Sequence, residues 1–286
     1  MTRMEAPIER GIGRIAVGAA LATGLAMALL GCSAGQGTAD EQPSSSGSSG
    51  ATEQTISGEL TIFAAASLQA AFDDLTAEFA TENPGVTFAP TVYDGSSVLV
   101  TQLQGGAQAD LFASADEANM AKAADAGLLS GDAEMFATNE LVIAVAPGNP
   151  LGIESLADLA RAGESGEPPI TVMCADEVPC GAAARTLLEL NDVELTPASQ
   201  EQNVSATLAK VVAGEADAGL VYRTDVQGSD GAVEAVEIAG ADEHLNVYPI
   251  AVLEGADAPE AARAFVEFVR SDRGQAVLAG YGFGAP

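Results

Sequence analysis

From Glu59 onward, the chain alternates between short apolar runs and segments whose apolar residues recur at helical spacing. This alternation restricts the fold more than any other feature. The runs predicted as strands cover residues 59–64, 86–92, 110–114, 140–146, 170–173, 217–222 and 247–253. The segments predicted as helices cover 116–126, 155–161, 182–190, 204–213, 259–270 and 273–280. Such alternation is typical of α/β proteins with mainly parallel sheets.

The first 57 residues are predicted to lie outside the folded part. Three arginines within the first 14 residues precede an apolar run at 15–30, and the sequence L-L-G-C follows, ending at Cys32. This pattern predicts a lipoprotein signal peptide over residues 1–31, which is removed so that Cys32 becomes the lipidated N-terminus. An uncleaved membrane anchor is the less favoured alternative, because the run is short for a span. Residues 32–57 are rich in Ser, Gly, Gln and Thr and are typical of a flexible tether.

The charge of the chain excludes several classes of partner. Its 41 acidic and 11 basic residues leave a formal net charge of −30 at pH 7. So negative a chain is not expected to bind nucleic acid, or an anionic membrane surface by charge. A small anion would also be repelled at long range. Local dipoles would therefore have to hold any anionic ligand.

The cysteines predict a disulfide rather than a metal site. After Cys32, only Cys174 and Cys180 remain, in C-A-D-E-V-P-C. Outside the cytoplasm this pair is expected to close a short loop, with two free thiols as the alternative. Two cysteines and the remote His244 do not form a recognisable ligand set, so no cation site is predicted.

The segment T-I-F-A-A-A-S-L, residues 61–68, is predicted as a buried strand that ends in a serine opening a helix. Apolar residues recur after it at helical spacing, at Leu68, Phe72, Leu75 and Phe79. Ser67 is then expected to be the N-cap of that helix. A helix start offers free N–H groups and is a natural anion site, although a serine there often serves only as a cap.

Two similar corners follow along the chain. In Y-D-G-S-S-V-L-V, residues 93–100, a glycine precedes Ser96 and Ser97 at the start of a helical pattern. In V-P-C-G-A-A-A, residues 178–184, Cys180 presents its N–H at a helix start that follows a proline. Each corner could also be a plain turn with a cap.

Two further positions complete the set of candidate donors. In Q-N-V-S-A-T-L, residues 202–208, Asn203 is a predicted N-cap, and Val204 could offer only its backbone N–H. In A-D-A-G-L-V-Y-R, residues 216–223, a buried strand ends in Tyr222, which places a phenolic O–H at the carboxyl end of a strand. Taken separately, Val204 is a core residue and Tyr222 covers the edge of the core.

The residues of these motifs, and their order along the chain, resemble those of one known family. The matching segments are A-A-A-S-L (64–68), G-S-S (95–97), A-D-L-F-A-S-A-D (109–116), A-T-N-E-L-V (137–142), V-P-C-G (178–181), N-V (203–204), G-E-A-D-A-G-L-V-Y (214–222) and Y-P-I-A-V-L (248–253). Together with the closing R-G-Q-A-V-L-A-G-Y-G-F (273–283), they resemble the molybdate-binding proteins of bacterial ABC importers. The similarity runs over essentially the whole folded part.

The resemblance implies a periplasmic-binding-protein fold of type II, with two lobes and an oxyanion in the cleft between them. Residues 58–138 would begin the first lobe, 139–247 would form the second, and 248–286 would return to the first. The lobes would close about hinges near 138–140 and 245–249. The protein would act as a monomer on the outer face of the cell membrane, with a membrane permease as its partner.

The resemblance also implies the binding residues. Two serine hydroxyls, two backbone N–H groups and a tyrosine hydroxyl would hold the oxyanion; they belong to Ser67, Ser96, Cys180, Val204 and Tyr222. Ser97 is the register alternative to Ser96. One departure is Cys180, where the family commonly has alanine. No cofactor is expected besides the ligand, molybdate or tungstate.

A shell of neutral donors, without a carboxylate, suits a fully deprotonated dianion. Hydrogen phosphate would leave its proton without an acceptor, at a cost of roughly 1–3 kcal/mol. Sulfate meets the same charge requirement and could be rejected only by the size of the site. An organic carboxylate would require an arginine clamp, for which Arg185 and Arg223 are candidates. A serine hydrolase is disfavoured, because His244 is the only histidine and no G-x-S-x-G motif surrounds the serines.

Overall fold

The structure, a computed structural model, describes residues 56–162 and 166–286. The predicted signal peptide 1–31, the lipidation residue Cys32 and the tether up to residue 55 lie outside the described residues. Among the described residues, no helix is both long and apolar enough to cross a membrane.

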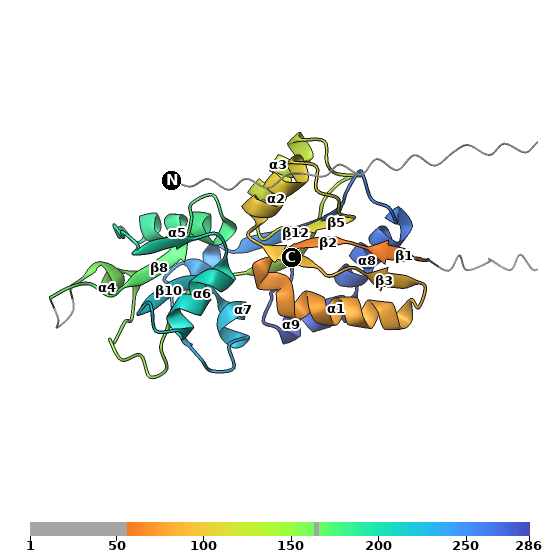
Figure 1. Ribbon diagram of the computed structural model, residues 1–286. Coiled ribbons are helices and arrows are strands. Elements are labelled where there is room, and N and C mark those ends of the chain that lie inside the picture. Colours follow the sequence, from red (N-terminus) through yellow and green to blue (C-terminus); the bar gives the residue numbers. More distant parts are fainter. Residues whose placement is uncertain (1–55, 163–165) are drawn as a thin grey trace, which may run out of the picture. The chain divides into compact units, whose positions relative to one another are not determined.

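The first lobe is built on a five-stranded sheet in the order β4-β2-β5-β12-β6 (Figure 1). Its strands are β2 (Ile62–Ala65), β4 (Val92–Asp94), β5 (Leu111–Ala113), β6 (Glu134–Asn139) and β12 (Asn246–Val252). The helices of this lobe are η1 (Ala66–Leu68), α1 (Gln69–Glu82), α2 (Ser96–Gln104), α3 (Glu117–Asp125), α8 (Pro259–Arg270) and α9 (Asp272–Gly280). A parallel pair, β1 (Gly58–Leu60) with β3 (Val86–Phe88), stands beside the sheet.

The second lobe has a sheet of the same size in the order β11-β7-β10-β8-β9. Its strands are β7 (Leu141–Val145), β8 (Thr171–Cys174), β9 (Ser199–Glu201), β10 (Ala218–Tyr222) and β11 (Glu234–Glu237). Its helices are α4 (Leu156–Ala160), α5 (Pro179–Leu190), α6 (Val204–Val212), α7 (Arg223–Gln227) and η2 (Ala241–Glu243). The chain passes between the sheets twice, at Glu140 and through residues 238–245, close to the expected hinges.

The α/β architecture with two sheets agrees with the prediction, but each sheet is mixed rather than mainly parallel. Strands β2, β4 and β5 are parallel to one another, and so are β8, β9 and β10. Every antiparallel pair of the two sheets contains either β7 or β12. These two strands follow the two crossings, so each enters its sheet from the other lobe. Strands β7 and β12 therefore start at the crossings, whereas the strands beside them end there, and the pairs are antiparallel.

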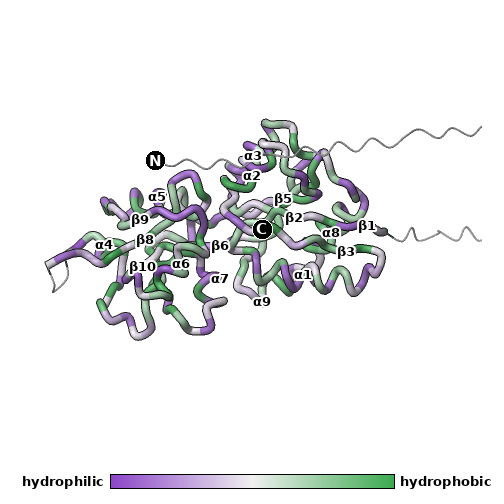
Figure 2. The backbone as a smooth tube through the Cα atoms, in the orientation of Figure 1, coloured by the Kyte–Doolittle hydropathy of each residue, from purple (hydrophilic) through white to green (hydrophobic). Residues whose placement is uncertain are grey.

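Burial explains why the apolar runs of the sequence predicted the central strands. All residues of β2, β5, β7, β8 and β10 are buried. A strand covered on both faces is apolar throughout. Figure 2 shows these hydrophobic segments inside each lobe, with hydrophilic positions concentrated on helices and loops. Helix α8 supplies Phe265 and Phe268 to a cluster of aromatic rings around Phe79.

The prediction missed β4, which it reaches only at Val92, and three strands with polar sequences. β9 reads S-Q-E and β11 reads E-A-V-E. Both are edge strands, which pair with a neighbouring strand on one side only and can therefore carry polar, partly exposed residues. β6 reads E-M-F-A-T-N; its first two residues are half-buried, and its last four, including the polar Thr138 and Asn139, are buried. The predicted run 59–64 is divided at Thr61, because β1 pairs with β3 while β2 pairs with β4 and β5.

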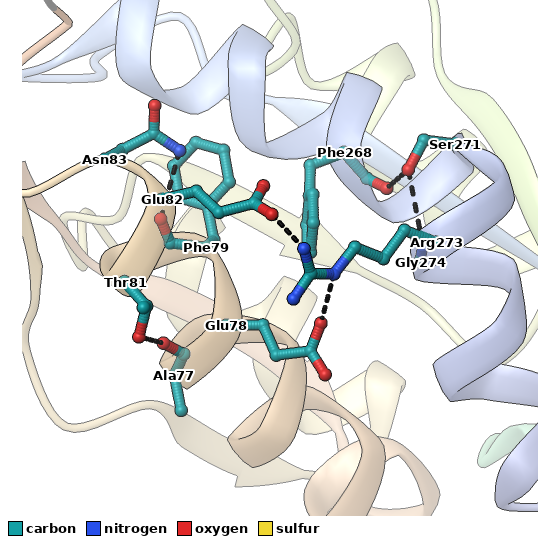
Figure 3. A network of polar contacts seen from close by, with 10 residues as sticks. All are labelled: Ala77, Glu78, Phe79, Thr81, Glu82, Asn83, Phe268, Ser271, Arg273 and Gly274. Carbon is teal, nitrogen blue, oxygen red and sulfur yellow. Dashed lines mark hydrogen bonds and ion pairs between the residues drawn. The ribbon is translucent and has the colours of Figure 1, made fainter.

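Ion pairs join helix α9, near the C-terminus, to helix α1 of the same lobe. Arg273 at the start of α9 donates to Glu78 and Glu82 on α1, as Figure 3 shows. Ser271 caps α9 by accepting from the Gly274 N–H. The return segment thereby completes the lobe that the chain begins.

Candidate functional site

The strand-to-helix corners of both lobes meet around one small cavity. It is lined by Ala65, Ala66, Ser67, Asp94, Gly95, Ser96, Ala115, Val178, Pro179, Cys180, Asn203, Val204 and Tyr222. The centre of a water-sized sphere can occupy about 10 Å³ of it. Sites for drug-sized organic molecules are far larger, at roughly 300–1,000 Å³. This volume is about what one water molecule needs, so this arrangement of the lobes leaves no room for an organic molecule of that size.

Two of the lining N–H groups come from helix starts of the second lobe. Pro179 is the first residue of α5, and Cys180 follows it in the first turn. Val204 is the first residue of α6, behind the N-cap Asn203, whose Oδ1 accepts from the Ala206 N–H at 2.9 Å. N–H groups at these positions have no acceptor within their own helix. The helix dipoles also place partial positive charge here, which favours an anion.

The predicted capping role of Ser67 is wrong, although its place at the cavity is as expected. Ser67 lies inside the 3₁₀ turn η1, and α1 begins only at Gln69, behind Leu68. Neither helix start has a side-chain cap. The Ser67 hydroxyl instead lies 3.0 Å from the hydroxyl of Tyr248, on β12. Because neither helix start uses a side-chain cap, the Ser67 hydroxyl makes no capping hydrogen bond to its own helix.

Ser96 is fully buried and has one hydrogen-bond partner already in place. Its Oγ accepts from the Ala115 N–H at 3.0 Å. A hydroxyl that accepts in this way still has its own hydrogen to donate. Ser97 does not line the cavity. Of the two register alternatives, the structure therefore places Ser96 at the cavity.

Tyr222 brings a phenolic hydroxyl to the cavity from the end of β10. The residue is 1% exposed, and its Oη is the one buried side-chain N or O atom without a hydrogen-bond partner among the described residues. Burial raises the pKa of Tyr222 well above its ordinary value, so the group keeps its proton. An unpaired buried hydroxyl costs about 1–3 kcal/mol. A ligand that accepts from it would recover that cost.

A second layer of polar groups stands behind these donors. Asn139, the last residue of β6, donates from Nδ2 to Thr224 Oγ1 at 2.8 Å and to the Tyr248 hydroxyl at 3.4 Å. Asp225 accepts from the Tyr222 N–H at 2.9 Å. Although Asp225 keeps some exposed surface, burial of its carboxylate raises its pKa to about 7. Sequence reasoning did not identify this layer, because its members come from distant segments.

Asp94 lines the cavity, and sequence reasoning did not expect a carboxylate there. Its Oδ1 accepts from the Gly95 N–H at 2.8 Å and from Asn203 Nδ2 at 2.7 Å. Gln202 Nε2 adds longer contacts of 3.3 and 3.4 Å to the two carboxylate oxygens. The signal was present in the sequence, since the aspartate directly precedes the G-S-S motif.

The lining contains no Lys, Arg or His. Both candidate arginines for a clamp are engaged elsewhere: Arg185 pairs with Asp176, and Arg223 pairs with Glu140 and Glu237. His244 is exposed. Within residues 56–162 and 166–286, no group of three His, Cys, Asp or Glu side chains is placed to hold a metal ion. The site therefore offers hydrogen-bond donors and helix dipoles for an anion.

The two remaining cysteines form a disulfide beside the cavity. The bond joins Cys174, at the end of β8, to Cys180, in the first turn of α5, with 5.7 Å between their Cα atoms. It connects the strand end to the helix start across a sequence separation of six. The N–H of Cys180 remains available because the bond uses only the side chain.

Comparison with known proteins agrees with this geometry. Residues 60–284 match the family model of bacterial extracellular solute-binding proteins. The molybdate-binding protein ModA of Mycobacterium tuberculosis is 42% identical over 266 residues, which cover 93% of this chain and 98% of ModA. YvgL of Bacillus subtilis, named as a substrate-binding lipoprotein of an ABC transporter, is 32% identical over 79% of this chain and 86% of its own.

A solved structure supports the same assignment. The substrate-binding domain assigned to a molybdenum ABC transporter of Clostridium difficile has 28% sequence identity and a TM-score of 0.59, over 80% of this chain and 99% of that domain. The fold, the matched length and the identity to ModA all point to a solute-binding protein of a transporter rather than an enzyme. The chain therefore belongs to the bacterial extracellular solute-binding proteins, and within them to the group that contains ModA.

Proposed function

We propose that this protein binds molybdate, and tungstate as well, between its two lobes and delivers the anion to the membrane permease of an ABC importer. Ser67, Ser96 and Tyr222 would donate from their hydroxyls, and Cys180 and Val204 would donate from their backbone N–H groups. The observation that carries the proposal is the buried, unpartnered hydroxyl of Tyr222 at a small cavity that residues of both lobes line. The names of the similar proteins support molybdate as the ligand.

The donor set supports a dianion that carries no proton. The five proposed donors belong to residues that line the cavity, and no basic side chain lines it, so the anion would be held by dipoles. Asp94 Oδ1 already accepts from the Gly95 N–H and from Asn203 Nδ2, which makes this oxygen a weaker acceptor for the proton of hydrogen phosphate. Molybdate and tungstate carry the same charge, and nothing in the donor set separates them.

The proposed domain limits follow the two chain crossings, with residues 58–138 and 248–286 in one lobe and 139–247 in the other. Strand β12 already begins at Asn246, so the return into the first lobe starts slightly earlier than the predicted limit. We further propose that Cys32 anchors a monomer to the outer face of the cell membrane through its lipid. The lipoprotein name of YvgL supports this anchor.

Calorimetry on the purified protein tests the ligand directly. Molybdate and tungstate are expected to bind with similar affinity, and sulfate and hydrogen phosphate are expected to compete weakly. Tyr222→Phe is expected to weaken molybdate binding by about 10-fold, because one hydrogen bond to a charged ligand is lost. If sulfate or hydrogen phosphate bound most tightly, or if no oxyanion bound, the assignment to molybdate would be wrong.

A further inference from the structure

Asp94 lies beside the cavity, where it contacts residues of the other lobe. It ends β4 and directly precedes Gly95 and Ser96 in the first lobe. Its partners in the second lobe are side-chain amides: Asn203 Nδ2 at 2.7 Å and Gln202 Nε2 at 3.3 Å from Oδ1. These contacts join residues more than 100 positions apart in the sequence. They are charge-assisted hydrogen bonds, which are stronger than neutral ones.

Asn203 connects this contact to the start of α6. Its Oδ1 accepts from the Ala206 N–H, which fixes the orientation of the amide group. Nδ2 must then point the other way, and there it meets Asp94. The same side chain therefore caps α6 and holds the first lobe. Val204, which lines the cavity, is the next residue along the chain.

On the other side, Asp94 orders the start of α2. Its Oδ1 also accepts from the Gly95 N–H at 2.8 Å, and Ser96 follows directly. The backbones of the two lobes touch here. A Cβ placed on Gly95 would lie 2.2 Å from the Gln202 carbonyl oxygen and 3.3 Å from Val178 Cγ1. The contact can form only because residue 95 has no side chain.

We propose that Asp94 is a positioning residue, a latch that holds the lobes closed and sets the distance between the Ser96 hydroxyl and the Val204 N–H. The proposal rests on the proposed anion-binding function and adds a residue to it. A carboxylate beside an anion would ordinarily weaken binding by repulsion. Here three N–H groups from both lobes surround the carboxylate, and the contact exists only when the lobes are together. Asp94 is thus expected to slow the release of the anion.

Asn203→Ser is the informative substitution, because it changes no charge. Serine is also a good N-cap, so α6 is retained, but its side chain lacks the amide that reaches Asp94. In stopped-flow experiments with molybdate, the variant is expected to release the anion about 10-fold faster, with a much smaller change in the association rate. In an Asp94→Ala background, the same substitution is expected to have little further effect. Equal effects of Asn203→Ser in both backgrounds would overturn the latch.

Two glutamines provide a matched control. Gln202→Ala removes an amide that reaches Asp94 across the lobes, whereas Gln200→Ala removes an amide that donates to Asp176 within the second lobe. Faster release is expected for Gln202→Ala, by a few-fold because its contacts are long, and no change for Gln200→Ala. Equal rates in the two variants would count against the latch.

The failure of the proposed function can be told apart from the failure of the latch. If the unsubstituted protein binds no oxyanion, the proposed function is wrong. The latch is then measured by X-ray scattering of the ligand-free protein. The Asp94→Ala, Asn203→Ser double variant is expected to have a larger radius of gyration than the unsubstituted protein. Identical scattering curves would overturn the latch as well.

Discussion

The hydroxyl oxygens of Ser67 and Tyr248 lie 3.0 Å apart, although 181 positions separate the two residues in the sequence. Asn139 Nδ2 approaches the same phenolic oxygen at 3.4 Å. Because an amide nitrogen can only donate, Tyr248 accepts from Asn139 and can donate its own hydrogen to Ser67. Ser67 then keeps its hydrogen for the cavity. The direction of the serine hydroxyl is therefore set by a residue that does not line the cavity.

The two buried tyrosines are expected to respond differently to substitution by phenylalanine. Tyr248→Phe removes hydrogen bonds to Ser67 and Asn139 and is expected to lower the free energy of unfolding by about 1 kcal/mol. Tyr222→Phe removes an unpaired hydroxyl and is expected to leave the ligand-free protein equally stable or slightly more stable. Urea unfolding without ligand and calorimetry with molybdate separate the two effects. A loss of stability in Tyr222→Phe would show that its hydroxyl has a partner in the free protein.

Gly95→Ala is expected to act as a wedge between the lobes. The backbone of Gly95 suits any residue, but the added Cβ would lie 2.2 Å from the Gln202 carbonyl oxygen. Closure is then incomplete, and molybdate affinity is expected to fall by at least about 10-fold while the stability of the free protein changes little. Gly280→Ala is the control, since nothing lies within 4 Å of its Cβ position. Equal affinities in the two variants would contradict the close interlobe contact.

Loss of the Cys174–Cys180 disulfide is expected to reduce stability more than binding. Closing so short a loop contributes about 2 kcal/mol through the entropy of the unfolded chain. The start of α5 is also held by its backbone, because the Gly181 N–H donates to the Val178 carbonyl at 2.9 Å. The double substitution of both cysteines by alanine should therefore lower the free energy of unfolding by about 2 kcal/mol. Molybdate affinity should change by less than about 3-fold, and a larger loss would mean that the disulfide positions the Cys180 N–H.

Asp225 is expected to make stability fall with rising pH. Burial raises its pKa from the ordinary 3.8 to about 7 in the folded protein. Between these values the folded state binds the proton and the unfolded state does not, so this residue lowers the free energy of unfolding as pH rises from about 4 to about 7. The loss is on the order of 4 kcal/mol, since the shift is about three pKa units and each unit corresponds to about 1.4 kcal/mol.

Asp225→Asn separates this contribution from those of other carboxyls, because asparagine can still accept from the Tyr222 N–H. Asp158, Glu201 and Glu237 have lowered pKa values and act in the opposite direction. The difference in unfolding free energy between the variant and the unsubstituted protein is therefore expected to grow from pH 4 to pH 7 and to stay constant above. A difference that did not depend on pH would mean that Asp225 ionises normally in the folded protein.

The helix limits were predictable where they depend on residues that are close together in the sequence. The predicted helices at 116–126 and 204–213 agree with α3 and α6 to within one residue at each end, and Asn203 is the N-cap that the pattern predicts. Edge strands β9 and β11 were not predictable, because their polar sequences do not alternate clearly with apolar residues. The cap predicted at Ser67 was wrong because a 3₁₀ turn leaves the same apolar spacing as a capped helix start.

The sequence by itself determined the α/β architecture, the group to which the chain belongs and the segments that offer N–H and O–H donors, since each depends on patterns within a few residues. Only the tertiary structure decided how the donors are oriented and what stands behind them. Tyr248 reaches Ser67 from the returning strand β12, and Asn203 reaches Asp94 from the other lobe. Such contacts are set by how sheets and helices pack across large sequence separations. A pattern within a few residues cannot predict contacts of this kind.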